Sequence, residues 1–138
     1  MREILFRGKD KFGDWHEGNL IHQTQYYGDP VDLYHIVSVG EFYYENYLHD
    51  TVIPETVGQF TGLTDKNGKR IFEGDVVDID IGHLKRRGFV FYEDTGAKFG
   101  VMIGTEKNFS FLGRQMVKMY NVTVNGNIHD QPELLKSE

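Results

Sequence analysis

A reversing turn near the middle of the chain constrains the fold more than any other feature of the sequence. Residues 65–69, Asp-Lys-Asn-Gly-Lys, combine side chains that hydrogen-bond their own backbone with a glycine that accepts a positive φ, and apolar residues flank them. Glu73-Gly74-Asp75 then leads into residues 76–81, where polar and apolar residues alternate after Val77. Alternation with a period of two is typical of a half-buried strand. The segment therefore predicts a turn followed by the first strand of a compact β domain, with Val77, Ile79 and Ile81 pointing inward.

Turn residues recur at short intervals beyond this strand. The 138 residues include 16 Gly and only 3 Pro, with 8 Tyr and 10 Phe, a composition that favours strands joined by glycine turns over a helical bundle. About five short strands after Asp75 predict that residues 57–138 form an SH3-like small barrel or roll that hides its own edges. In this interpretation Arg86-Arg87-Gly88 is a turn, residues 116–124 are a strand, and a short helical turn follows Pro132.

Residues 1–56 predict a second, β-rich subdomain, so the whole chain is expected to be mainly β. Met1–Phe6 and Trp15–Ile21 form a candidate hairpin, and a rigid turn at Pro54 closes this half. An aromatic segment lies between them. Aromatic side chains among polar neighbours are favoured at interfaces, so the segment predicts self-association into a homo-oligomer; a half-buried strand and a ligand-stacking surface are the alternatives. The candidate interface residues are Phe42, Tyr43, Tyr44, Tyr47 and Leu48.

Three segments resemble the YopX family of small phage and prophage proteins. They read VGQFTGLTDKNGKRIFEGDVV (57–77), ILFRGKDKFGDWHEGNL (4–20) and VNGNIHDQPELL (124–135), and they follow one another in the order expected for that family. The resemblance implies a phage or prophage context and carries no established biochemical activity. The signature residues, which we interpret as architecture, are Gly58, Gly62, Asp65, Gly68, Glu73, Gly74 and Asp75. Asp65 and Asp75 are expected to bind backbone amides across their turns.

The sequence contains no pattern typical of an enzyme. It has no Cys, its six His are scattered, and its glycines lack the spacing of a phosphate-binding loop. Asp78 and Asp80 share one face of a strand, which we interpret as the solvated face. We therefore expect no catalytic residues, no metal ion and no cofactor. The preferred function is a non-enzymatic interaction or assembly module that binds a host or phage protein.

One concentrated basic site supports an alternative function. A run of three charged residues usually marks only a solvated turn. The alternative is that Lys85, Arg86 and Arg87, with Phe89 or Phe91 nearby, form a loop that contacts single-stranded nucleic acid or another anionic partner. The net charge of −6 counts against a nucleic-acid-binding accessory factor, because affinity for nucleic acid depends largely on neutralising phosphates. The excess acid is N-terminal: residues 1–50 carry 4 Lys and Arg against 9 Asp and Glu.

The sequence also indicates a compartment. It contains no run of about 20 apolar residues that could span a membrane, and its N-terminus lacks the apolar core of a signal peptide. We expect a protein of the bacterial cytoplasm without a membrane partner.

Overall fold

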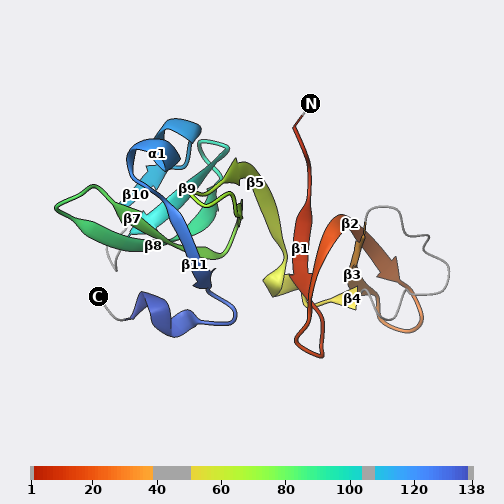
Figure 1. Ribbon diagram of the computed structural model, residues 1–138. Helices are drawn as coiled ribbons and strands as arrows, with labels where there is room; N and C mark the ends of the chain where they lie inside the picture. Colours follow the sequence, from red (N-terminus) through yellow and green to blue (C-terminus); the bar gives the residue numbers. More distant parts are fainter. Residues whose placement is uncertain (1, 39–50, 104–107, 137–138) are drawn as a thin grey trace. The chain divides into compact units, whose positions relative to one another are not determined.

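The computed structural model describes residues 2–38, 51–103 and 108–136, and its contacts divide the chain into two compact units (Figure 1). The units are Met1–Gln59 and Phe60–Glu138, whereas the sequence analysis places the boundary after residue 56. The predicted mainly β fold is confirmed. The strands are β1 (Phe6–Lys9), β2 (Trp15–Gln25), β3 (Val31–Val37), β4 (Thr51–Val52), β5 (Gly58–Thr64), β6 (Arg70–Phe72), β7 (Asp75–Asp80), β8 (Lys85–Glu93), β9 (Lys98–Ile103), β10 (Asn108–Phe111) and β11 (Thr123–Asn127). One α-helix, α1 (Arg114–Met119), and two 3-10 turns, Pro54–Thr56 and Pro132–Leu135, complete the described chain.

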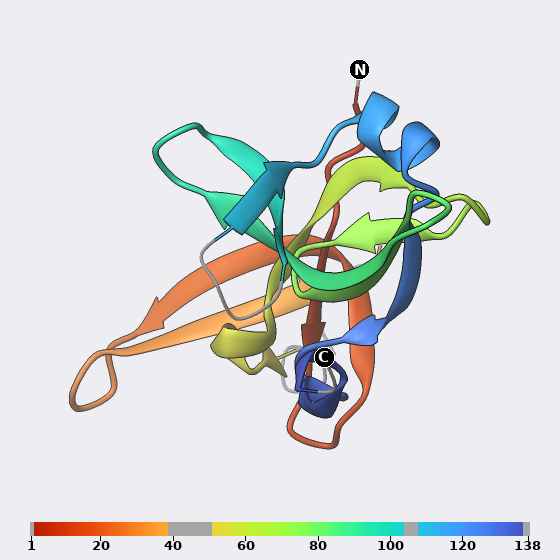
Figure 2. The ribbon, with the colours of Figure 1, turned by 90° about the vertical axis from the view of Figure 1, so that its left-hand side faces the viewer.

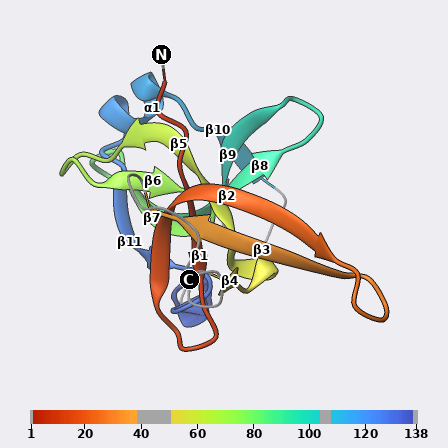
Figure 3. The same ribbon diagram turned by 90° about the vertical axis from the view of Figure 1, so that its right-hand side faces the viewer.

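The N-terminal unit is an antiparallel sheet with the strand order β4-β3-β2-β1. Gly58 and Gln59, at the start of β5, pair with β1. The β2–β3 hairpin is the longest in this unit (Figure 3). Gly18 lies where the sheet leaves no room for a side chain, because a Cβ there would overlap the backbone of Val37. β2 continues to Gln25, beyond Ile21, where the expected hairpin strand ends.

The C-terminal unit contains an open sheet with the strand order β10-β9-β8-β7-β11, together with the hairpin formed by β5 and β6 (Figure 2). The expected SH3-like small barrel or roll is mainly β as predicted, but the strands that the structure describes do not close into a barrel. Strands β10 and β11 form the two edges of this sheet and do not pair with each other within the described residues. The sheet edges are separated in sequence by α1, which occupies the position where a continuous strand was expected.

The core of the C-terminal unit lies between the sheet, α1 and the β5–β6 hairpin. Its buried residues are Ile71, Val77, Ile79, Val90, Val101, Val117 and Val122, and Leu63, Ile103, Leu112, Met116 and Val124 pack against them. Val77 and Ile79 point inward as predicted, because alternate residues of a strand face the same side. Ile81 does not: its side chain is 38% exposed, since β7 ends at Asp80.

Two local predictions in this unit are wrong for identifiable reasons. Arg86, Arg87 and Gly88 are not a turn but part of β8, and a Cβ on Gly88 would overlap the carbonyl oxygen of Met102 on β9. The glycine therefore marks a close approach of two strands. The actual turn lies earlier, at Gly82, whose φ is +91° and whose amide donates to Asp80 Oδ1 at 2.8 Å.

Residues 116–124 are not one strand, because the first part of this segment is the end of α1. The helix stops at a left-handed residue, Asn121 (φ 46°), as helices often do one residue beyond their C-terminal cap. A helix of six residues is too short to show a clear 3.6-residue apolar period. No described helix is long and apolar enough to cross a membrane.

The predicted C-terminal helical turn is the 3-10 turn Pro132–Leu135. The segment that leads into this turn is bonded to the C-terminal unit, because the amide of Ile128 donates to the carbonyl oxygen of Gly74 at 2.8 Å. Arg87 Nη1 donates to the carbonyl oxygen of Leu134 at 3.4 Å. The first half of β8 and the C-terminal segment are therefore connected through one arginine.

Candidate functional site

Asp65 organises the turn that borders the candidate site. Its side chain is buried, and its Oδ1 accepts hydrogen bonds from the amides of Asn67 at 2.8 Å and Lys69 at 2.9 Å. Its Oδ2 accepts from the amide of Val124, on β11, at 2.9 Å. The amide of Lys66 donates to the carbonyl oxygen of Val122 at 3.0 Å. The turn is thus fixed to the start of β11 at two points.

The other signature residues also have structural positions. Gly62, Gly68 and Gly74 all have φ between +83° and +87°, where residues with a side chain are strained. Asp75 is 2% exposed, and its Oδ2 accepts from the amide of Phe72 at 2.8 Å. The backbone hydrogen bonds expected of Asp65 and Asp75 are both present. Gly58 is buried at the start of β5 and Glu73 is half-buried before Gly74.

The predicted basic residues line a pocket of about 440 Å³, which we call the strand pocket. Lys85, Arg86 and Arg87 occupy the first three positions of β8, opposite Asp80, Ile79 and Asp78 of β7. The lining residues are Lys66, Asp78, Ile79, Asp80, Lys85, Arg86, Arg87, Asn121 and Thr123. The three residues therefore reach the pocket from a strand and not from the loop that the sequence predicts.

Arg87 differs from its two neighbours because it is held by a carboxylate. Its Nε donates to Asp78 Oδ1 at 2.7 Å and its Nη2 to Asp78 Oδ2 at 3.3 Å. Asn125 Nδ2 also donates to Asp78 Oδ2, at 3.1 Å. With its further bond to Leu134, Arg87 has a structural role. Lys85 and Arg86 are exposed and form no ion pair with any described residue.

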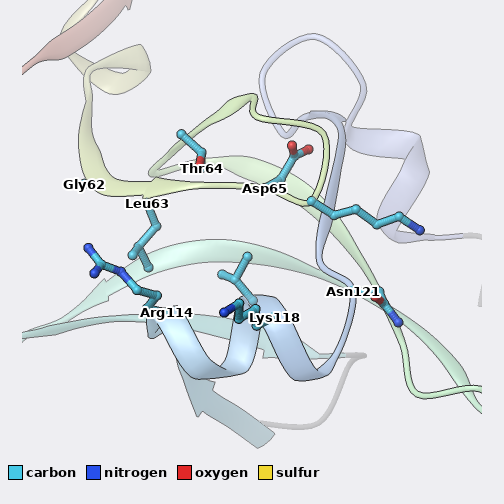
Figure 4. A pocket seen from close by; sticks show the side chains of 9 residues that line it. Gly62, Leu63, Thr64, Asp65, Arg114, Lys118 and Asn121 are labelled. Carbon is cyan, nitrogen blue, oxygen red and sulfur yellow. The ribbon is translucent and has the colours of Figure 1, made fainter.

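A second pocket, of about 480 Å³, lies between the 65–69 turn and α1 (Figure 4); we call it the helix pocket. Its lining residues are Gly62, Leu63, Thr64, Asp65, Lys66, Arg114, Val117, Lys118 and Asn121. Arg114 and Lys118 are four positions apart on α1, which puts them on one face of the helix. Figure 4 shows Leu63 pointing from β5 toward this helix, and the carboxylate of Asp65 pointing away from Arg114 and Lys118.

The two pockets share Lys66 and Asn121, so they adjoin each other. Apart from Arg87, five cationic side chains surround them: Lys66, Lys85, Arg86, Arg114 and Lys118. All five are exposed, and none forms an ion pair with a described residue. Of the carboxylates that line the pockets, Asp65 binds backbone amides and Asp78 binds Arg87, while Asp80 Oδ1 accepts from the amide of Gly82.

The two units differ in net charge, which bears on the argument that the acidity of the chain disfavours nucleic-acid binding. Residues 1–59 carry 4 Lys and Arg against 10 Asp and Glu, whereas residues 60–138 carry 11 of each. The whole net charge of −6 therefore belongs to the N-terminal unit. The overall acidity of the chain does not describe the unit that contains the two pockets.

Sequence reasoning missed Lys66, Arg114 and Lys118. Lys66 was assigned only to the turn, Lys118 was placed inside a supposed strand over residues 116–124, and Arg114 was placed before that strand. The spacing of Arg114 and Lys118 was a usable signal, because residues four apart share a helix face. It had meaning only once residues 114–119 were recognised as helical.

The aromatic residues expected near the basic site do not line it. Phe89 and Phe91 contact each other, with ring centroids 6.2 Å apart, and neither lines either pocket. The aromatic segment proposed as an oligomer interface, Phe42, Tyr43, Tyr44, Tyr47 and Leu48, lies outside the described residues. Self-association through it remains a prediction.

Residues 2–38, 51–103 and 108–136 contain no group of three or more His, Asp or Glu placed to hold a metal ion. The N-terminal unit contains two His–Asp pairs: His16 Nε2 lies 2.7 Å from Asp10 Oδ2, and His22 Nε2 lies 3.1 Å from Asp32 Oδ1. Asp78 and Asp80, which share a strand face, have separate partners as described above. The exposed cations around the two pockets can bind an anion electrostatically.

Comparison with known proteins gives a protein family and similar solved structures. The family model described as "YopX protein" matches residues 5–136. A crystal structure of protein EF1440 from Enterococcus faecalis is similar, with 24% sequence identity, a TM-score of 0.50, and coverage of 98% of this chain and 99% of that chain. A comparison with curated proteins found no match. The structural similarity supports the fold and assigns no function.

Proposed function

The chain belongs to the YopX protein family, and we propose that it is a non-enzymatic binding protein whose C-terminal unit contacts single-stranded nucleic acid. The resemblance to phage and prophage proteins suggests a bacterial cytoplasm as its place of action. The proposal favours the nucleic-acid alternative of the sequence analysis over a module that binds only proteins. A protein partner bound through residues 42–48 is compatible with it.

One observation supports the proposal: five exposed cations surround two adjoining pockets and no described carboxylate pairs with any of them. Like charges gathered in this way repel one another, and a polyanion removes that repulsion while releasing its own counterions. Lys66 belongs to both pockets, so a ligand that follows the surface from one pocket to the other would meet cations along its whole path.

The shape of the site favours a single strand over a duplex. Pockets of about 440 and 480 Å³ have the volume of small-molecule sites. A flexible strand can place individual nucleotides in such hollows, whereas the convex surface of a duplex reaches only their rims. Because no aromatic side chain is among the described residues that line the pockets, the phosphates supply most of the contact and we expect little sequence preference.

The carboxylates of the site support a binding role without a chemical step. A general base needs a carboxylate that is free to reach a substrate proton. Asp65 and Asp78 use both their oxygens to hold the turn and Arg87, and Asp80 holds the amide of Gly82.

The proposal is tested by the fluorescence anisotropy of a labelled 15-nucleotide thymidine oligomer at low salt. We expect the double variant Lys85→Gln, Arg86→Gln to bind at least about tenfold more weakly, because each substitution removes a charge-assisted phosphate contact. Lys69→Gln is the matched control: Lys69 is an exposed lysine of the same region that lines neither pocket. If the wild-type protein leaves the anisotropy unchanged, or if both variants bind like wild type, the proposal is wrong.

A further inference from the structure

We infer that the helix pocket binds a phosphorylated nucleoside, either free or at the end of a strand. This site takes a whole nucleotide, whereas the strand pocket contacts backbone phosphates. The inference shares the helix pocket with the proposed function, but its ligand can be supplied as a small molecule and its variants differ from Lys85→Gln, Arg86→Gln, so the two can fail separately.

One wall of the helix pocket is apolar and rigid. Val117 is 8% exposed and belongs to the core, and Leu63 packs against that core while lining the pocket. Gly62 leaves the adjoining wall open, since no atom lies within 4 Å of the place where its Cβ would be. A flat apolar group such as a nucleobase can lie against this wall without displacing a side chain.

Three cations border the same space. Arg114 and Lys118 come from one face of α1 and Lys66 comes from the turn on the other side of the pocket. Like charges four residues apart disfavour a helix, and the described structure supplies no carboxylate partner that would relieve this repulsion. A phosphate or diphosphate group between the helix and the turn would neutralise all three.

The pocket is held in shape by backbone hydrogen bonds. The amide of Lys66 binds the carbonyl oxygen of Val122 at 3.0 Å, and the amide of Val122 binds that of Val117 at 3.2 Å. These bonds connect the turn, the end of α1 and the start of β11. A preformed site loses less conformational entropy on binding, which favours a specific small ligand over a purely electrostatic contact.

Together, the apolar wall and the three cations favour one class of ligand. A simple inorganic anion would make no use of Leu63 and Val117, and a neutral nucleoside would make no use of the cations. A nucleotide uses both. The volume of about 480 Å³ is within the usual range for sites of this kind.

Isothermal titration calorimetry with ADP, pyrophosphate and adenosine tests the inference. We expect ADP to bind more tightly than either of the others. Arg114→Gln and Lys118→Gln should each weaken ADP binding by about tenfold, the lower end of what a hydrogen bond to a charged group contributes. Lys69→Gln should bind ADP as wild type does.

A truncation variant separates the apolar wall from the charges. Leu63 lines the pocket and points from β5 toward α1, so Leu63→Ala should remove apolar contact with a nucleobase and leave Lys66, Arg114 and Lys118 in place. We expect this variant to bind ADP no more tightly than pyrophosphate, while its binding of pyrophosphate stays as in wild type. Circular dichroism of each variant confirms that it is folded.

The source of the nucleotide is identified by comparing six-nucleotide thymidine strands with and without a 5′-phosphate. Tighter binding of the phosphorylated strand, lost in Arg114→Gln, supports the end of a strand as the ligand. Equal binding of both strands, together with tight ADP binding, supports a free nucleotide. The inference is wrong if ADP binds no more tightly than pyrophosphate, or if Arg114→Gln and Lys118→Gln bind ADP as wild type does. These results are independent of the 15-nucleotide experiment, because Lys85 and Arg86 do not line the helix pocket.

Discussion

Asp10 and Asp65 form the same turn, one in each unit of the chain. In both turns Oδ1 accepts two backbone amides, those of the residues two and four positions later. In both, the aspartate amide donates to the carbonyl oxygen four positions later, and its own carbonyl accepts from a glycine three positions later. Those glycines, Gly13 and Gly68, have φ of +90° and +83°. The pattern Asp-Lys-X-Gly-X is thus a self-contained turn that the chain uses twice.

The second carboxylate oxygen distinguishes the two turns. Asp10 Oδ2 lies 2.7 Å from His16 Nε2, six residues away, whereas Asp65 Oδ2 accepts from the amide of Val124, 59 residues away. Asp10 therefore stabilises a local hairpin. Asp65 also connects the turn that borders the helix pocket to β11.

We expect replacement by asparagine to lower the free energy of unfolding more at position 65 than at position 10. In Asp65→Asn the side-chain NH₂ group would face the N–H of Val124. Two hydrogen-bond donors would then oppose each other without an acceptor, which lowers the free energy of unfolding by about 1–3 kcal/mol. In Asp10→Asn the same group faces His16 Nε2, which can accept a hydrogen bond in the tautomer that leaves this nitrogen without a proton. Urea unfolding followed by circular dichroism gives the comparison. Equal losses of stability would contradict the assigned partners.

Asp10 should make the N-terminal unit sensitive to acid. The pKa of the Asp10 carboxyl is lowered below its ordinary value of 3.8. The hydrogen bond with His16 is the largest cause, and the hydrogen bond from the Asp14 amide is the second largest. A group whose pKa is lower in the folded state stabilises it above the unfolded pKa, and this stabilisation is lost as the pH falls through the folded value. The urea midpoint should therefore fall as the pH decreases below 3.8.

The fluorescence of Trp15, the only Trp in the chain, follows this unit directly. His16→Gln is the comparison variant, because it removes the ionisable partner of Asp10. We expect its midpoint to depend less on pH over the acidic range. A variant whose pH dependence matches that of wild type would exclude the Asp10–His16 pair as the cause.

Gly88→Ala should destabilise the C-terminal unit strongly. The new Cβ would overlap the Met102 carbonyl and contact Val101 in the middle of the sheet, so β8 and β9 would have to separate. Crowding of this kind costs about 1–3 kcal/mol or more. Gly113→Ala is the control, because no atom lies within 4 Å of its Cβ position. Thermal unfolding should separate the two variants, and an equal effect would show that the strand contact is unimportant.

Arg87→Gln should loosen the C-terminal segment without removing a main phosphate contact. The substitution breaks the pair with Asp78 and the bond to the Leu134 carbonyl. Amide hydrogen exchange in residues 128–136 should then become faster, whereas Arg86→Gln should leave it unchanged. A partly exposed ion pair contributes about 1 kcal/mol or less, so the unit should remain folded. Unchanged exchange in Arg87→Gln would refute the connection between β8 and this segment.

The sequence predicts the local turns and the alternation of inward and outward residues along β7. It does not predict whether the sheet closes. The 65–69 turn, the bonds of Asp65 and Asp75, and the inward faces of Val77 and Ile79 all depend on neighbours within a few residues. Whether the sheet closes depends on pairing between β10 and β11, which no local pattern specifies.

Gly88 and residues 114–119 show why the basic site was only partly identified. A glycine required for strand contact has the same identity as a glycine required for a turn, so Lys85, Arg86 and Arg87 were assigned to a loop. A helix of six residues resembles an apolar strand, so Arg114 and Lys118 were not recognised. The site combines a turn, a strand and a helix that only the folded chain brings together.

The salt dependence of single-stranded DNA binding tests the central claim most directly. For single strands, the logarithm of the binding constant falls with the logarithm of salt concentration by about 0.7 for each phosphate contact. We expect Lys85→Gln, Arg86→Gln to reduce this slope by about 1.4, and Lys69→Gln to leave it unchanged. A slope that is the same in wild type and the double variant would mean that these residues do not contact phosphates, and would contradict the account.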